Sequence, residues 1–333
     1  MVLNPYVFAR GDETTALVGQ LIVERIFGNV PRIDIPLSVE QRLATNDSCI
    51  GKFAAALRKY GAAAKMSTAS ADPRILEAGF GSANILLRNE MDVLGIWRMV
   101  QHPRNYETPV GVFRYGSGGF YNETDYQIVE EDGEIFGYST TQMNLSNIEP
   151  FARIAANLAS EHKLKIMVCS KHTIAPSEAE FNKRVLEALE KSCVQGVSVL
   201  TDVAVATQAT NLKGGVLYIM DNPNGDTGSD VIDWADGSRT MGSTLYCKGY
   251  IKYEELPGGT APDLLKTDLE GQTFFNPMGT ILAIGSAIVT ANPDLKDKVD
   301  LVTLEGAKYV QHTAGPNCDT RAMIDLIASK NHI

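Results

Sequence analysis

The chain has 333 residues, of which 44% are hydrophobic and 21% are charged, and it carries a formal net charge of −10 at pH 7. This composition is typical of a globular protein long enough for two domains, and its acidic balance argues against a general nucleic-acid or anionic-membrane binder. An anionic substrate would therefore need a local cluster of basic side chains.

Helix and strand patterns alternate along most of the chain, which predicts an α/β fold. Apolar residues at helical spacing predict helices over residues 15–26, 47–60, 147–160, 178–193, 202–210 and 277–289. Short apolar runs predict strands over residues 110–114, 126–130, 165–169 and 215–220. Residues 84–98 are predicted to form a helix that continues into an extended segment. Shifts in charge and glycine content place domain boundaries within residues 99–121 and 221–244.

Three features that the sequence lacks narrow the class of protein. The five cysteines form no CxxC pair, which indicates reduced thiols in a cytosolic protein and argues against a cysteine-bound zinc. The N-terminal residues contain no basic segment followed by an apolar run, so we expect no secretory signal. No stretch approaches about 18 uninterrupted apolar residues, so we expect no membrane span.

The first group of candidate site residues is Ser82, Asn84, Arg88 and Arg98. Two arginines preceded by two small polar donors are able to clamp carboxylates through bidentate hydrogen bonds. A solvated helix face, with Ser82 as its N-terminal cap, explains the same residues and is the simpler interpretation of this segment alone.

The second group combines an arginine, a tyrosine and a lysine. Arg114 ends a predicted strand, and a glycine-rich turn separates it from Tyr121. This order could place a guanidinium and a phenol over one pocket, and the phenol could act as a general acid, although an ordinary tyrosine packed at a strand edge explains it too. Lys171 directly follows an apolar strand, so it is either a proton relay with a lowered pKa or a surface lysine. The neighbouring His172 is interpreted as structural.

The third group consists of aspartates. Asp226 and Asp230 are four residues apart, so a helix starting here would place both carboxylates on one face. Like charges at this spacing repel, and a hard cation bound by both would remove that cost. Asp202, at the start of another predicted helix, could be a third ligand. One helix-capping and one solvated aspartate form the alternative.

The fourth group is a glycine-rich turn, Gly258-Gly259-Thr260-Ala261-Pro262-Asp263, followed by Asn276. Glycine lets a backbone approach a nucleotide closely. The carboxylate of Asp263 could bind the ribose hydroxyls of NAD and would repel the 2′-phosphate of NADP. The turn is not a GxGxxG motif, so a classical Rossmann fold is not predicted, and a plain surface turn is the alternative.

Taken together, these segments resemble the decarboxylating β-hydroxyacid dehydrogenases, which act on isocitrate, 3-isopropylmalate, homoisocitrate or tartrate. The resemblance runs from about Gly11 to the final helix, and several motifs match in order and spacing at once. Ala44-Thr45-Asn46-Asp47 and the segment from Ser82 to Arg88 are most similar to isocitrate dehydrogenases. The resemblance implies an isocitrate/isopropylmalate dehydrogenase-like fold of two α/β domains with the active site in the cleft. The large, cofactor-binding domain would comprise residues 1–105 and 238–333, and the small, dimerisation domain residues 106–237.

The same resemblance implies a role for each candidate residue. Ser82 and Asn84 would contact the distal carboxylate of the substrate, and Arg88, Arg98 and Arg114 would hold its remaining carboxylates. Tyr121 and Lys171 match the proton-transfer pair. Asp202 would be a catalytic base and, with Asp226 and Asp230, a ligand of Mg²⁺ or Mn²⁺. The expected coenzyme site comprises Ser70, Gly259, Thr260, Ala261, Asp263 and Asn276, with Asp263 as the NAD-type residue.

The implied activity is NAD-dependent oxidative decarboxylation of isocitrate, or a close isocitrate-like 2-hydroxy acid, by a cytoplasmic homodimer. Lys171 and Asp202 would reach the active site of the neighbouring subunit. Two departures are Gly11-Asp12-Glu13-Thr14 in place of the common GDGIG form, and Gly258 where the family usually has histidine. With the short chain, they leave open a specialised biosynthetic paralogue acting on a phosphonate-bearing analogue, homoisocitrate, isopropylmalate or tartrate. A non-catalytic regulatory subunit is a further alternative, against which the complete set of candidate residues argues.

Overall fold

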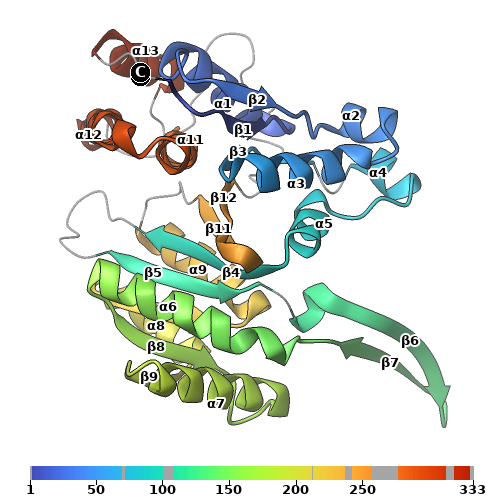
Figure 1. Ribbon diagram of the computed structural model, residues 1–333. Helices are drawn as coiled ribbons and strands as arrows, with labels where there is room; N and C mark the ends of the chain where they lie inside the picture. Colours follow the sequence, from blue (N-terminus) through green and yellow to red (C-terminus); the bar gives the residue numbers. More distant parts are fainter. Residues whose placement is uncertain are drawn as a thin grey trace. The chain divides into compact units, whose positions relative to one another are not determined.

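The computed structural model describes residues 2–69, 72–100, 109–116, 118–211, 213–236, 242–256, 277–312 and 319–330. The chain divides into two compact units, each with its own helices packed on a β-sheet (Figure 1). Unit 1 comprises Met1–Asp92 and Gly237–Ile333, and unit 2 comprises Val93–Asp236. The sequence placed the corresponding boundaries after residues 105 and 237.

Unit 1 is built on strands in the order β2-β1-β3-β12-β11. β1 (Tyr6–Ala9) is fully buried and runs parallel to β2 (Arg32–Asp34) and β3 (Ala63–Lys65). An apolar strand buried on both faces is typical of a parallel sheet covered by helices. β12 (Lys252–Glu255) is parallel to β3 and antiparallel to β11 (Ser243–Cys247).

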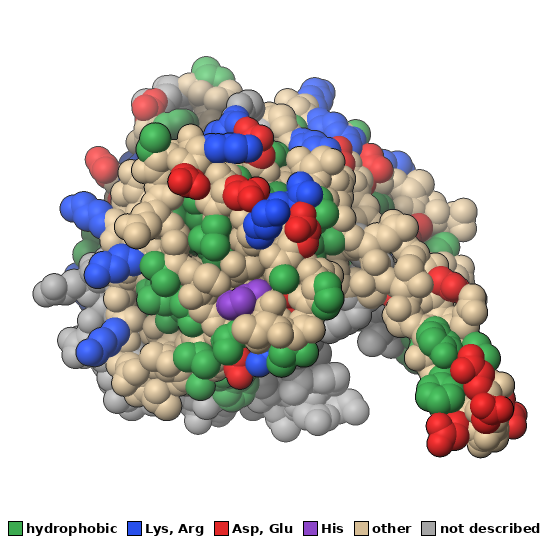
Figure 2. All heavy atoms as spheres, turned by 90° about the horizontal axis from the view of Figure 1, so that it is seen from below, with side chains coloured by type: hydrophobic (Ala, Val, Ile, Leu, Met, Phe, Trp, Pro, Cys, Tyr) green, Lys and Arg blue, Asp and Glu red, His purple; other side chains and the backbone are tan. Residues whose placement is uncertain are grey.

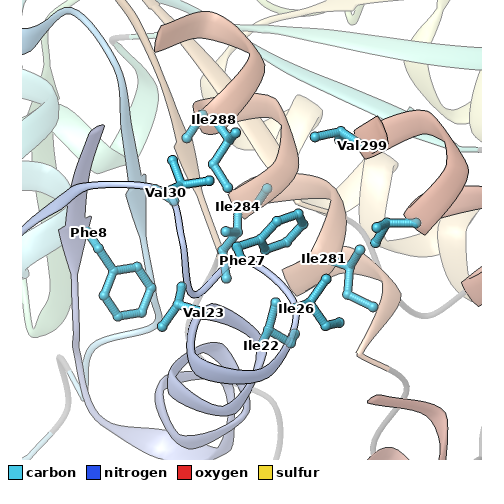
Figure 3. Close-up of a cluster of buried hydrophobic side chains, with 14 of the residues drawn as sticks. Phe8, Ile22, Val23, Ile26, Phe27, Val30, Ile281, Ile284, Ile288 and Val299 are labelled. Atoms are coloured by element: carbon cyan, nitrogen blue, oxygen red, sulfur yellow. The ribbon is translucent and has the colours of Figure 1, made fainter. Parts of the chain in front are cut away.

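The hydrophobic core of unit 1 lies where β1 meets the first and the late helices. Figure 3 shows Phe8 of β1, Ile22 and Phe27 from the first helical segment, and Ile284 from the late one, gathered in this core, and all four are buried. The helices of unit 1 are α1 (Glu13–Arg25), α2 (Val39–Ala44), α3 (Ser48–Tyr60), α4 (Pro73–Glu77), α5 (Ala83–Glu90), α11 (Met278–Ala291), α12 (Lys296–His312) and α13 (Thr320–Lys330).

Unit 2 is built on strands in the order β4-β5-β10-β8-β9. β5 (Val110–Tyr115), β10 (Val216–Met220), β8 (Lys165–Ser170) and β9 (Gly196–Leu200) run parallel, and β4 (Val93–Val100) is antiparallel to β5. Because the carboxyl ends of parallel strands meet at one edge of a sheet, Arg114, Ser170 and Asp221 are brought to the same edge.

Helices cover both faces of the unit 2 sheet. α6 (Ile148–His162) packs with α7 (Pro176–Lys191) on one face, and α8 (Thr201–Asn211) packs with α9 (Asn222–Asp236) on the other (Figure 1). A separate hairpin of β6 (Glu123–Glu131) and β7 (Glu134–Thr141) extends from unit 2. None of the helices in the described ranges is both long and apolar enough to cross a lipid bilayer.

The helices and strands predicted from the sequence are confirmed, with ends displaced by a few residues. The predicted helix over residues 15–26 is α1, and residues 84–98 form α5 followed by β4. The conditional helix at Asp226 is present, but it begins earlier, at Asn222.

One buried carboxyl group in unit 1 makes the stability of the fold depend on pH. Glu254, on β12, accepts hydrogen bonds from the hydroxyl of Thr244 at 2.9 and 3.1 Å and from the hydroxyl of Ser286 at 2.7 Å. Burial raises the pKa of Glu254 to about 7, although the hydroxyl groups of Ser286 and Thr244 and the charge of Lys252 oppose that shift.

We expect Glu254→Gln to remove part of the pH dependence of folding. The pKa of Glu254 is 4.5 when unperturbed and about 7 in the fold, so the folded chain holds this proton more tightly than the unfolded chain does. The group therefore lowers the free energy of unfolding as pH rises through this interval, by about 2 to 3 kcal/mol in total. Above neutral pH, the variant should be more stable than the unsubstituted protein in urea denaturation.

Glu305→Gln is the matched control for this measurement. Lys308 and Lys330 hold the pKa of Glu305 at about 2, so its stabilising contribution is lost only as pH falls below the unfolded value of 4.5. Between pH 4.5 and 7, the interval in which Glu254 titrates, the free energy of unfolding of the control should change with pH as it does in the unsubstituted protein. If the free energy of unfolding of Glu254→Gln showed the same pH dependence as that of the unsubstituted protein, Glu254 would not be the group responsible for it.

Candidate active site

One face of α9 in unit 2 carries the polar groups that contact two buried arginines. Asn222, Asp226, Ser229 and Asp230 are spaced so that their side chains share one side of the helix. Arg114, near the end of β5, and Arg98, on β4, are each only 2% exposed. Arginine is rarely buried to this extent without partners, and α9 supplies those partners.

The two guanidinium groups are held by direct hydrogen bonds. Arg114 donates through Nε to Asn222 Oδ1 at 2.6 Å and through Nη1 to the carboxylate of Asp226. Arg98 Nη1 donates to Ser229 Oγ at 2.6 Å and to Asp230 Oδ1 at 2.8 Å. Arg98 Nη2 lies 3.2 Å from Asp226 Oδ1, so Asp226 connects both arginines.

Tyr121 joins this cluster from the short helix η1 (Gly119–Asn122). Its hydroxyl donates to Asp226 Oδ2 at 2.7 Å, and the Cζ atom of Arg114 lies 5.4 Å from the centre of its ring. The guanidinium charge over the ring is a cation–π contact. The structure thus brings Arg114 and Tyr121 together.

The donors on α9 fit a hard divalent cation. Asp226 and Asp230 offer carboxylate oxygens one helical turn apart, and Mg²⁺ and Mn²⁺ take oxygen ligands. Partial desolvation raises the pKa of Asp230, and the charge of Asp226 acts in the same direction, while Arg98 opposes both. A cation would relieve that repulsion. Within the described ranges no three carboxylate, histidine or cysteine side chains gather as a metal site, so Asp202 does not join this pair within one chain.

Lys171 and Asp202 form a separate pair in unit 2. Lys171 Nζ lies 2.8 Å from Asp202 Oδ1, and the Asp202 side chain is 61% exposed. The hydrogen bond from Lys171 holds the pKa of Asp202 below its usual range. The backbone at Lys171 is fixed because its N–H donates to the carboxylate of Glu178.

The candidate residues of unit 1 lie on α5. Ser82 occupies the N-cap position of this helix, although its side chain makes no capping hydrogen bond. Asn84 Oδ1 accepts a hydrogen bond from the buried Lys65 Nζ at 2.6 Å. Arg88 pairs with Glu255 at 2.6 Å, and their side chains are 12% and 1% exposed. The solvated helix face considered for Arg88 and Arg98 is therefore wrong, because Arg98 is buried on β4 and Arg88 is largely shielded in its ion pair with Glu255.

Sequence reasoning missed the residues that hold the candidate groups. Asn222 and Ser229 could have been found from their helical spacing to Asp226, once α9 was extended back to Asn222. Lys65 and Glu255 carry no local signal, because each stands in a short strand far from its partner in the sequence. Six candidates for the coenzyme site lie outside the described residues: Ser70, Gly259, Thr260, Ala261, Asp263 and Asn276.

Comparison with known proteins finds a matching family model and related enzymes. The family model described as isocitrate/isopropylmalate dehydrogenase matches residues 81–302. The cytoplasmic NADP-linked isocitrate dehydrogenase of Saccharomyces cerevisiae is 29% identical, over 86% of this chain and 82% of its own length. The chloroplastic/mitochondrial NADP-linked enzyme of Arabidopsis thaliana is 26% identical, over 99% of this chain and 82% of its own.

A solved structure shares the fold. Isocitrate dehydrogenase from Ostreococcus tauri, in complex with isocitrate and magnesium(II), superposes with a TM-score of 0.83 at 21% identity, covering 98% of this chain and 99% of that one. The expected fold is thereby confirmed.

Proposed function

The chain belongs to the isocitrate/isopropylmalate dehydrogenase family, whose model matches more than half of it, and on that premise we propose that it oxidises and decarboxylates isocitrate or a close analogue. The observation that carries the proposal is the cluster in which the buried Arg98 and Arg114 meet Tyr121, Asp226 and Asp230. This cluster combines guanidinium groups for carboxylates, oxygen ligands for a cation and a phenol for proton transfer.

Arg98 and Arg114 would bind substrate carboxylates by exchanging partners. Both guanidinium groups now pair with Asp226 or Asp230, which are the proposed ligands of Mg²⁺ or Mn²⁺. When those carboxylates turn to a cation, the guanidinium groups are free to form charge-assisted bonds with the substrate. A bound Mg²⁺ or Mn²⁺ would polarise the hydroxyl and carbonyl oxygens of the substrate. Asn222 would keep Arg114 Nε in place during the exchange.

In this proposal, proton transfer is carried out by Tyr121, Lys171 and Asp202. Asp202, or a water held by Lys171, would take the proton of the 2-hydroxyl group, and the nicotinamide of the coenzyme would supply the hydride acceptor for the oxidation at C2. After CO₂ departs, Tyr121 would donate its proton to C3, and the charge of Arg114 over its ring would stabilise the phenolate that remains. Lys171 would then return a proton to Tyr121.

We propose that Lys171 and Asp202 serve the neighbouring subunit of a homodimer. Asp202 is exposed on α8, next to Val203, and Val203 on α8 and Val231 and Trp234 on α9 are 50%, 42% and 61% exposed. α8 and α9 pack against each other, and exposed large apolar side chains on neighbouring helices are typical of a surface covered by a partner.

The β6–β7 hairpin supports the same proposal. Tyr126 and Ile128 stand on one face of it and Phe136 and Tyr138 on the other, and all four are at least 40% exposed. A lone two-stranded sheet is marginally stable in water, so a second copy covering it would supply the missing burial. Figure 2 shows hydrophobic and acidic side chains side by side along this hairpin.

We expect Val203→Glu combined with Val231→Glu to convert the proposed dimer into monomers with little activity. A charge placed in an apolar interface loses its hydration without gaining a partner, which weakens association strongly. Light scattering coupled to size exclusion would measure the mass. Leu76→Glu, at a 62% exposed position on α4, is the control and should leave the mass unchanged. A double variant that remains dimeric would contradict the proposed surface.

The distal group of the proposed substrate is anionic. Lys65 places a buried ammonium 2.6 Å from the side chain of Asn84, one of the two residues assigned to that group. A positive charge there suits a carboxylate or a phosphonate and disfavours the alkyl group of isopropylmalate. A phosphonate-bearing analogue therefore stays the second candidate beside isocitrate.

For the coenzyme, the sequence and the relatives point in different directions. Asp263 favours NAD, whereas the relatives compared above are NADP-linked by name. We propose NAD, since a carboxylate would repel the 2′-phosphate of NADP. We also propose a cytoplasmic location, although relatives occur in the cytoplasm, mitochondria and peroxisomes by name; fractionation of the source cells would test it.

One assay tests the proposed function. The purified protein, with Mg²⁺ or Mn²⁺, is given isocitrate, homoisocitrate, isopropylmalate, tartrate and a phosphonate analogue of isocitrate, each with NAD and with NADP. We expect reduced NAD with isocitrate or the phosphonate. Turnover only with NADP would refute the coenzyme assignment, and no turnover at all would favour a regulatory subunit.

A further inference from the structure

Arg42, on α2, is a buried arginine with contacts on three sides. Its side chain is 1% exposed, and it pairs through Nε and Nη2 with the two carboxylate oxygens of Asp47, at 2.7 and 2.8 Å. Nη2 also donates to the carbonyl oxygen of Gly81 at 2.7 Å, and the guanidinium carbon lies 5.9 Å from the centre of the Phe80 ring. Arg42 therefore holds both residues that directly precede Ser82.

The partner of Arg42 sits in an unusual backbone conformation. Asn46 and Asp47 are consecutive residues with left-handed φ angles of 49° and 61°, a region that only glycine, asparagine and aspartate adopt with any frequency and seldom twice in a row. Asp47 also occupies the N-cap position of α3, yet its side chain makes no capping hydrogen bond there. Both of its oxygens are committed to Arg42 instead. The fold thus gives up a side-chain cap of α3 to form this pair.

The geometry points to Arg42 as a positioning residue for recognition of the distal group of the substrate. The chain runs from Gly81, held by Arg42, through Ser82 at the N-cap of α5 to Asn84, held by Lys65. The segment assigned to the distal group is therefore fixed at both ends by buried cations. This inference rests on the proposed function, because it takes the roles of Ser82 and Asn84 from it.

Arg58 provides a matched comparison within the same unit. It lies on α3 and pairs with Glu90 at the opposite end of α5, at 3.1 Å, but its side chain is 48% exposed. Both arginines thus tie α5 to a neighbouring element. Only Arg42 does so next to Ser82, with a buried bidentate ion pair, so only its loss should disturb the distal-group segment.

We expect Arg42→Met to raise the KM for isocitrate about tenfold with a smaller change in kcat. Malate, used as a competitive inhibitor, has the structure of isocitrate without the distal carboxymethyl arm. Its inhibition constant should therefore change by less than about twofold in Arg42→Met. Arg58→Met should leave both constants within about twofold. An unchanged KM in a folded Arg42 variant, or equal weakening of isocitrate and malate, would overturn the inference.

Two further measurements keep the test decisive. If Arg42→Met does not fold, Arg42→Lys keeps the charge but loses the bidentate pair, and the same shift in KM is expected. Hydrogen exchange needs no turnover: the Leu86 amide, which donates to the Ser82 carbonyl at 3.0 Å, should exchange faster in the Arg42 variants than in Arg58→Met. Unchanged exchange would refute the positioning role. A wild-type protein inactive on every acid would refute the proposed function instead.

Discussion

Replacement of Arg114 by alanine is expected to lower kcat/KM for the proposed substrate by about two orders of magnitude or more. Arg114 is buried, and it contacts Asn222, Asp226 and Tyr121 at once. Its loss would leave a substrate carboxylate without its partner and Tyr121 without the charge over its ring. Steady-state kinetics with saturating Mg²⁺ would measure the effect, and circular dichroism would check the fold.

Arg114→Lys separates the charge of Arg114 from its shape. A lysine keeps the positive charge but cannot hold Asn222 and a carboxylate through two nitrogens of one rigid plane. We therefore expect it to recover only part of the lost activity. Activity of Arg114→Ala within tenfold of the unsubstituted protein would remove Arg114 from the proposed active site.

Periodic patterns predicted most of the longer helices, because burial of one face leaves a local trace in the sequence. α6 and α7 bury regularly spaced apolar residues, and both were predicted. The short strands β1, β2 and β3 were not, since four residues or fewer carry too little pattern. These strands exist because the parallel sheet of unit 1 pairs them.

The start of α9 shows where local propensity fails. Asn222-Pro223-Asn224-Gly225 contains residues typical of turns, so the sequence allowed a helix only from about Asp226. In the fold, Pro223 lies in the first helical turn, where its missing N–H costs nothing, and the glycine packs against Arg114. Tertiary contacts, which the local pattern does not contain, extend the helix back to Asn222.

The candidate site was predictable in its residue types but not in its partners. The pairing of Arg88 with Glu255 spans 167 positions of the sequence, so no local pattern could distinguish it from a solvated arginine. The same holds for Lys65 and Asn84, whose contact depends on where β3 and α5 pack. The pairing of Asp226 with Asp230 could be predicted from the sequence, because residues four apart lie on the same face of a helix.

Gly225→Ala is expected to damage both stability and activity, although alanine favours helices. A Cβ atom at this position would lie 2.7 Å from Arg114 Cβ, 2.8 Å from its Cγ and 3.2 Å from its Cα, so either α9 or β5 must move. Overpacking of this kind costs about 1–3 kcal/mol, which exceeds or cancels the gain of about 1 kcal/mol in helix propensity. A displaced Arg114 should lower kcat/KM about a hundredfold.

Gly228→Ala, three residues further along the same helix, is the matched control for this prediction. Its Cβ would meet Met220 Sδ at 3.0 Å and Val205 Cγ2 at 3.2 Å, and the flexible methionine is able to give way. The control gains the same helix propensity without touching Arg114, so it should retain activity and lose little or no stability. If both variants behave alike in urea denaturation and in turnover, close packing of α9 against Arg114 does not set the geometry of the site.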